Sequence, residues 1–160
     1  MYIEEKMYKE LQLVALPNLA LSNPKMYYNI GLLTLASVAE REGYKVEVLD
    51  WRAGKPNKPI RIVSMVGFSC TTPEITAAKE LSMQLRSLKV YTFVGGAHPT
   101  LNPDDCLPYF DCVVIGEGES ILPFLLNTKP KGVLAASRIN NLDLIPLPSW
   151  DLISDPFSDT

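Results

Sequence analysis

The segment IVSMVGFSCTTPEITAAKELSMQLRSLKVYTFVGG, residues 62–96, decides the fold class of this protein. It opens with an apolar run at residues 62–68 and closes with another at residues 90–94, and both runs are typical of buried strands. Between them, residues 71–74 (Thr-Thr-Pro-Glu) predict the start of a helix, since they combine a threonine cap, a first-turn proline and the glutamate of a capping box. A strand, a helix and a strand in this order predict a right-handed crossover between two parallel strands.

The same alternation extends along most of the chain. Further strands are expected at residues 12–16, 44–50 and 112–115, and further helices at residues 29–42, 103–109 and 118–126. Five strands alternating with helices predict an α/β fold with a parallel sheet that helices cover on both faces. We expect the doubly wound, flavodoxin-like or Rossmann-like arrangement with strand order 2-1-3-4-5.

The predicted domain occupies residues 1–127, and residues 128–160 are expected to form an irregular extension. A sixth strand at residues 132–138 is an open alternative, and Pro146-Leu147-Pro148 is typical of a linker.

Composition narrows the function classes. The chain has 160 residues, enough for one domain, and its net charge of -3 without a cluster of Lys and Arg argues against a nucleic-acid surface. No segment approaches the roughly 20 apolar residues that span a bilayer, and the first ten residues lack a signal core, so no membrane partner is expected. Three sparse cysteines (Cys70, Cys106 and Cys112) suit a reducing compartment, and we expect a cytoplasmic protein.

Ligands of open parallel sheets bind beyond the carboxyl ends of the strands. This rule selects the loops at residues 17–29, 69–72, 95–100 and 116–119. Outside the helices, these loops hold most of the hydroxyl residues, the Gly-Gly pair and the histidine. Gly95-Gly96 admits either a tight turn or the close approach of a flat ligand. Ser69 precedes the helix cap, so its hydroxyl is free to bind a ligand, whereas Thr71 is better placed to cap.

Other polar residues in these loops have competing interpretations. His98 suits either a polar contact or, less well, a metal ligand, because it is the single histidine of the chain. Glu117 and Glu119 suit either an acid/base pair or the favourable charge at a helix N-terminus, and we favour the latter.

Catalytic motifs are missing from the sequence. There is no Cys-x3-Cys-x2-Cys for an iron–sulfur cluster, no phosphate loop, no Gly-x-Gly-x-x-Gly after the first strand and no nucleophile triad. We therefore expect no metal-ligand set and no iron–sulfur cluster in this chain, which should be non-catalytic on its own. The sequence also argues against a phospho-receiver, because the central strand ends in Phe68-Ser69 and not in an acceptor Asp.

An ordered set of stretches resembles the N-terminal cobalamin-binding domain of the cobalamin-dependent radical S-adenosylmethionine enzyme family. The stretches are NIGLLTLA (29–36), EGYKVEVLD (42–50), VGFS (66–69), VGGAHPT (94–100), FDCVVIGEGE (110–119) and LPSWDL (147–152). Together they cover most of the chain in the expected order.

The resemblance implies cobalamin, a metal-containing cofactor, bound across the carboxyl edge of the sheet. Ser69, Gly95 and Gly96 would surround its nucleotide tail. The full set of expected cofactor-binding residues is Ser69, Cys70, Thr71, Gly95, Gly96, His98, Thr100, Gly116, Glu117 and Gly118.

Two departures from the family qualify this expectation. The loop after the first strand, residues 17–24, lacks the Asp-x-His-x-x-Gly motif of many cobalamin domains, which implies a form with no protein His on cobalt. The radical S-adenosylmethionine barrel is also absent, and residues 147–152 resemble the junction that precedes it. A catalytic domain or protein of that type is therefore the expected partner, and the alternative is a degenerate domain that lost the cofactor and acts as an interaction or scaffold module.

Overall fold

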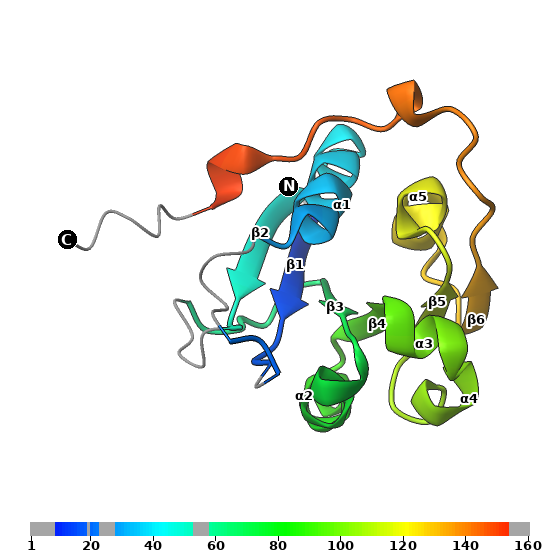
Figure 1. Cartoon of the computed structure of the whole chain (residues 1–160). Coiled ribbons are helices and arrows are strands. Elements are labelled where there is room, and N and C mark those ends of the chain that lie inside the picture. Colours follow the sequence, from blue (N-terminus) through cyan, green and yellow to red (C-terminus); the bar gives the residue numbers. More distant parts are fainter. Residues whose placement is uncertain (1–8, 19, 23–27, 53–57, 154–160) are drawn as a thin grey trace, which may run out of the picture.

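The computed structural model describes residues 9–18, 20–22, 28–52 and 58–153 (Figure 1). The strands are β1 (Glu10–Ala15), β2 (Lys45–Asp50), β3 (Met65–Ser69), β4 (Tyr91–Gly95), β5 (Cys112–Ile115) and β6 (Gly132–Ala135). The helices are α1 (Ile30–Arg41), α2 (Ile75–Ser87), α3 (Ala97–Leu101), α4 (Pro103–Cys106) and α5 (Gly118–Thr128). All paired strands are parallel, in the order β2-β1-β3-β4-β5-β6.

The α/β class and the parallel order of the first five strands are confirmed, but the prediction of a five-stranded sheet is wrong. β6 pairs with β5 over four residues, from Gly132 opposite Cys112 to Ala135 opposite Ile115. Its side chains are only half-buried or exposed, so its pattern is much weaker than that of a central strand. The expected irregular extension therefore contains an edge strand, and the domain boundary at residue 127 stays a prediction.

The segment after β4 also differs from expectation. We expected a loop at residues 95–100 and one short helix at residues 103–109, whereas α3 and α4 follow one another directly. Asn102 separates them with non-helical backbone, and Pro103 then starts α4, since proline fits a first helical turn. The predicted strand at residues 62–68 begins later, at Met65.

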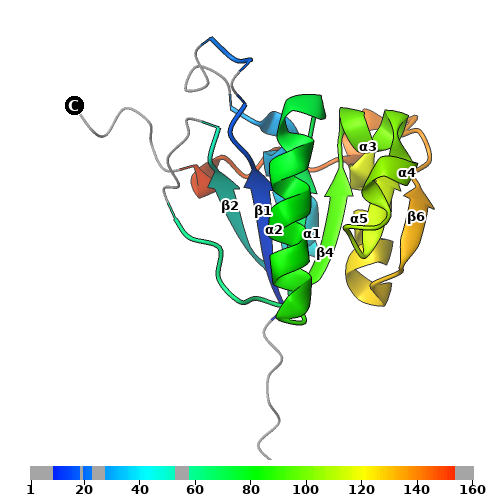
Figure 2. The same cartoon turned by 90° about the horizontal axis from the view of Figure 1, so that it is seen from below.

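Helices cover both faces of the sheet. In Figure 1, α1 and α5 lie on one side, and Figure 2 shows α2 and α4 in front of the other. Alternate residues of the strands supply the two cores, because successive side chains point to opposite faces. Leu11 and Leu13 pack on the α1 and α5 side, whereas Val14 and Val66 pack on the α2 side.

Residues 136–152, which we call the strap, return across the outside of α5 and α1 (Figure 1). The Ser149 N–H donates to the Leu33 carbonyl at 3.1 Å, and the Ser149 hydroxyl donates to Glu40 Oε2 at 2.6 Å. Nearer to β6, the Ser120 hydroxyl on α5 donates to the Ser137 carbonyl at 3.0 Å. The strap therefore links the two helices on this face of the sheet.

Within the described ranges, no helix combines the length and the apolar character needed to cross a membrane.

Candidate functional site

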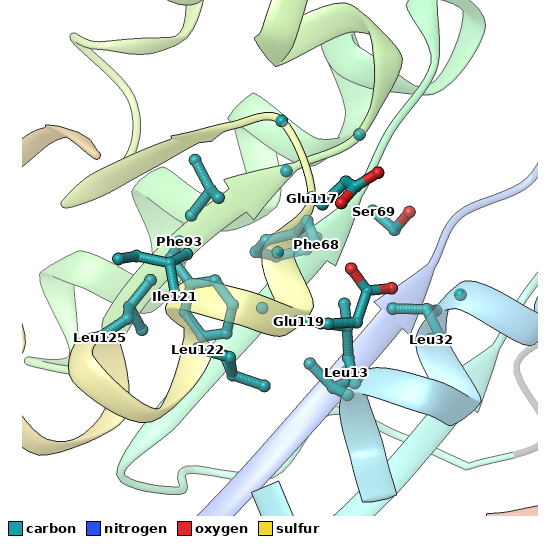
Figure 3. A pocket seen from close by; sticks show the side chains of 18 residues that line it. Leu13, Leu32, Phe68, Ser69, Phe93, Glu117, Glu119, Ile121, Leu122 and Leu125 are labelled. Carbon is teal, nitrogen blue, oxygen red and sulfur yellow. The ribbon is translucent and has the colours of Figure 1, made fainter. Parts of the chain in front are cut away.

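A pocket of about 170 Å³ lies between α1 and α5 and opens toward the carboxyl ends of the central strands (Figure 3). The strands β1, β3, β4 and β5 form its floor, and the two helices form its walls. Its lining consists almost entirely of glycine and apolar side chains, and the polar side chains in it are those of Ser69, Glu117 and Glu119. An apolar pocket with a few convergent polar groups is typical of a cofactor or small-molecule site.

Gly67, in the middle of β3, shapes the floor of the pocket. A Cβ atom at this position would lie 2.4 Å from Cζ of Phe93 and 3.0 Å from Cδ2 of Leu13. Because glycine has no side chain, the side chains of Phe93 and Leu13 pack directly against the β3 backbone. A larger residue at position 67 would push them into the pocket. Gly67 therefore leaves space for the pocket above the sheet.

Ser69 and the paired glycines form one part of the rim. Ser69 lies opposite Gly95 in the register of β3 and β4, and both residues line the pocket. Gly96 has φ of 113°, and a Cβ atom there would lie 2.6 Å from the Cys70 carbonyl oxygen. This close backbone crossing requires glycine, so the rim stays free of side chains at this point.

The turn after β5 forms the opposite part of the rim, where Gly116, Glu117 and Gly118 lead into α5. Two contacts hold this turn from behind. The Gly116 N–H donates to Thr100 Oγ1 at 3.2 Å, and Glu117 Oε2 accepts from the Ile139 N–H of the strap at 2.8 Å. Thr100 thus supports the rim without lining the pocket.

Four of the ten expected site residues do not line the pocket, namely Cys70, Thr71, His98 and Thr100. Cys70 is buried, and burial raises the pKa of its thiol, which keeps the thiol protonated. The N–H and the hydroxyl of Thr71 both donate to Glu74 Oε2, at 2.5 and 2.6 Å, so the predicted capping box is present. Thr71 therefore stabilises a helix start.

His98 is also outside the pocket lining. Its ring is buried, with Nδ1 3.1 Å from Thr72 Oγ1 and Nε2 2.9 Å from Asp105 Oδ2. Lys79 Nζ lies 2.7 Å from the same carboxylate oxygen, and the hydrogen bonds from Lys79 and then His98 lower the Asp105 pKa. Both ring nitrogens of His98 therefore lie within hydrogen-bond distance of protein partners, and its role toward a ligand or a metal stays a prediction.

Sequence reasoning missed the helical walls of the pocket. Gly31, Leu32 and Leu35 of α1 face the hollow, and so does the side of α5 that carries Leu122 and Leu125. In the sequence these residues are ordinary members of an amphipathic helical face, which predicts core packing. Their role depends on how α1 and α5 pack against one another and against the sheet, and no local sequence pattern reports that packing.

Comparison with protein families decides what kind of domain this is. The sequence pattern of the B12 binding domain matches residues 20–126, which is well over half of the chain. The chain belongs to the B12-binding domain family. The expectation of a cobalamin-binding domain is thereby confirmed.

Two curated relatives are methyltransferases. The B12-binding chain is 27% identical to bacteriochlorophyllide d C-8(2)-methyltransferase of Chlorobaculum tepidum, over 66% of this chain and 23% of that protein. It is 29% identical to an uncharacterized methyltransferase of Pyrococcus horikoshii, over 78% of this chain and 34% of that protein. The chain thus spans about a quarter to a third of the length of these relatives.

Solved structures share the fold of this B12-binding domain. The radical S-adenosylmethionine methyltransferase TsrM of Kitasatospora setae superposes with a TM-score of 0.58 at 22% identity, covering 74% of this chain and 25% of that one. The N-terminal domain of a hypothetical protein of Thermotoga maritima has a TM-score of 0.51 at 21% identity, covering 72% of this chain and 98% of that one.

Proposed function

We propose that this domain binds cobalamin, with the nucleotide tail of the cofactor in the pocket between α1 and α5 and the corrin ring over the rim. The observation that carries the proposal is that Ser69, Gly95 and Gly96 converge with the turn at residues 116–118 around the mouth of one apolar pocket. The family supports the choice of cofactor.

The residues present fit such a cofactor. The rim is edged by glycines, and at Gly96 a Cβ atom would collide with the Cys70 backbone, so a broad, flat ring meets little side-chain bulk. Below the rim, apolar side chains such as Leu32, Phe93 and Leu125 offer the dry surroundings that suit an aromatic base. Ser69 adds a hydroxyl that can donate or accept at the mouth.

We propose that no protein histidine binds the cobalt atom. The chain holds one histidine, and His98 lies outside the pocket with both ring nitrogens close to partners on other residues. When bound, cobalamin supplies a cobalt atom that can carry a methyl group, and the role of this chain is to hold the cofactor and leave one face of the corrin accessible.

We propose that the partner is a radical S-adenosylmethionine catalytic domain, to which this domain presents the cofactor. The relatives are longer methyltransferases, of which this chain spans about a quarter to a third. On the strap, Leu142, Leu144 and Leu147 expose 70, 71 and 85% of their surface. Exposed apolar side chains gathered on one short segment support a protein contact there.

These leucines also favour a second candidate, in which the domain is an interaction module that has lost the cofactor. The two candidates make different predictions for the pocket. If the domain binds cobalamin, a substitution that fills the pocket without unfolding the protein should abolish corrin binding. If it is an interaction module, the same substitution should have no functional effect.

The deciding experiment mixes the purified protein with hydroxocobalamin and follows corrin absorbance through gel filtration. We expect co-elution with the native protein. Gly31→Phe, which places a ring on the α1 wall of the pocket, should abolish co-elution, whereas the adjacent Ile30→Phe at a position with 53% exposure should retain it. Folded native protein that carries no corrin would overturn the proposal and favour the interaction module.

A further inference from the structure

Glu119 is the polar side chain of the pocket whose role the fold does not explain. Figure 3 shows its carboxylate directed toward Ser69 and away from Leu122 and Leu125. The neighbouring Glu117 is already committed to the Ile139 N–H, 2.8 Å away. Glu119 is half-buried, and within the described part of the chain it forms no side-chain hydrogen bond and no ion pair.

The charge of Glu119 is uncompensated within the pocket. Among the residues that the structure describes, no Lys, Arg or His side chain lines this space, and the remaining lining is apolar apart from Ser69 and Glu117. An ionised carboxylate only accepts hydrogen bonds, and partial burial of its charge is unfavourable until a donor or a cation arrives. The pocket therefore favours a ligand group that donates a hydrogen bond and disfavours an anionic group.

Helix polarity accounts for only part of this arrangement. Glu119 lies in the first turn of α5, where a negative charge is favourable. That effect needs a carboxylate near the helix N-terminus, but it does not require the side chain to point into a pocket. The exposed side of the same turn, where Ser120 lies, would serve helix polarity without bringing a charge into the hollow.

We infer that Glu119 is a specificity-determining residue for the lower part of the cofactor. It accepts a hydrogen bond from a hydroxyl of the ribose on the nucleotide tail, and from the amino group of the base in a cobamide whose base carries one, and it keeps the anionic phosphate of the tail away from the pocket interior. This inference rests on the proposed function, because it takes cobalamin to be the ligand.

Binding titrations with three corrinoids test the inference. These are cobalamin, a cobamide with an adenine base, and dicyanocobinamide, which lacks the nucleotide tail. Glu119→Ala should weaken cobalamin binding about tenfold, the usual size of one hydrogen bond to a charged group, and change cobinamide binding less than twofold. Glu119→Gln, of nearly the same shape, should retain part of the affinity. Glu80→Ala, at an exposed position on α2, is the matched control and should leave all three affinities unchanged.

The arms of the experiment separate the possible donors. A larger loss with the adenine cobamide than with cobalamin shows that the adenine amino group also donates to Glu119, and equal losses show that a ribose hydroxyl alone donates. Equal affinities of the Glu119→Ala and native proteins for cobalamin would overturn the inference, as would a tenfold loss that extends to cobinamide. Both outcomes leave the proposed function intact, because that proposal fails only if the folded native protein binds no cobalamin.

Discussion

Ser69 and Gly95 lie directly opposite one another at the carboxyl ends of β3 and β4, and both line the same pocket. The Cys70 N–H continues this pairing by donating to the Gly95 carbonyl at 2.9 Å, and the His98 N–H donates to the Cys70 carbonyl at 3.2 Å. The rim is therefore a rigid, hydrogen-bonded backbone structure in which a side-chain hydroxyl faces a glycine.

This rigidity makes Gly96 intolerant of substitution. Gly96→Ala would place a methyl group 2.6 Å from the Cys70 carbonyl oxygen at a φ of 113°, so we expect a loss of about 1–3 kcal/mol in the free energy of unfolding. Chemical denaturation measures this loss. Gly95→Ala is the control, because its methyl group would meet only Val114 at 3.7 Å; equal stability of the two variants would contradict the structure.

Substitution of Gly67 should damage the floor of the pocket. Gly67→Val would force Phe93 and Leu13 upward into the hollow, and we expect destabilisation of about 3 kcal/mol together with loss of corrin binding. Thermal unfolding and the gel-filtration assay measure the two effects. A variant as stable as the native protein would show that the neighbours do not rest on the β3 backbone.

Ser149 should contribute measurably to stability although it lies far from the central sheet in sequence. Its hydroxyl is buried and donates to Glu40 Oε2 at 2.6 Å, a charge-assisted bond. Ser149→Ala should lower the free energy of unfolding by about 1.5–3 kcal/mol. Ser87→Ala removes an exposed hydroxyl that donates to the Gln84 carbonyl, and it should cost less than about 0.5 kcal/mol. Similar effects of both changes would mean that the strap is not held by Ser149.

His98 should serve structure and not cobalt ligation. His98→Gln removes the ring that lies between Thr72 and Asp105, and we expect a loss of about 1–2 kcal/mol in stability. The visible spectrum of bound hydroxocobalamin should not change. A shift of the spectrum in a variant that stays folded would place His98 on the cobalt.

The buried cysteines predict slow thiol chemistry and lower stability in alkali. Burial raises the pKa of the Cys112 thiol from its ordinary value of 9.0 to about 11, and it raises that of Cys70 further. At pH 8 both thiols are protonated in the folded protein, so reaction with a disulfide reagent should be slow until denaturant is added. Rapid reaction without denaturant would contradict their burial.

The pH dependence follows from the same shifts. A thiol whose pKa is higher in the folded than in the unfolded protein stabilises the fold below the unfolded value, and this contribution is lost as the unfolded chain ionises first. We therefore expect the free energy of unfolding to decrease between about pH 9 and 11. Denaturation curves across this range measure it, and the variant Cys112→Ala should show a smaller decrease.

Local chemistry was sufficient to predict much of the fold. The alternation of apolar runs with amphipathic segments predicted the α/β class and five of the strands. The caps were also readable, since Asn29 accepts from the Leu32 N–H at 3.1 Å and Thr71 forms its capping box with Glu74. These features depend on residues a few positions apart, which the sequence displays directly.

The sequence also singled out the rim, because carboxyl ends of neighbouring parallel strands must share an edge of the sheet. Ser69, Gly95, Gly96 and residues 116–118 meet there. Only the tertiary structure decided that β6 joins the sheet, that His98 turns toward Asp105, and that the pocket opens between α1 and α5. These outcomes depend on contacts between residues that are distant in the chain, as the hydrogen bond from Ser149 to Glu40 is. Such contacts produce no periodic pattern in the sequence, so they cannot be predicted from it.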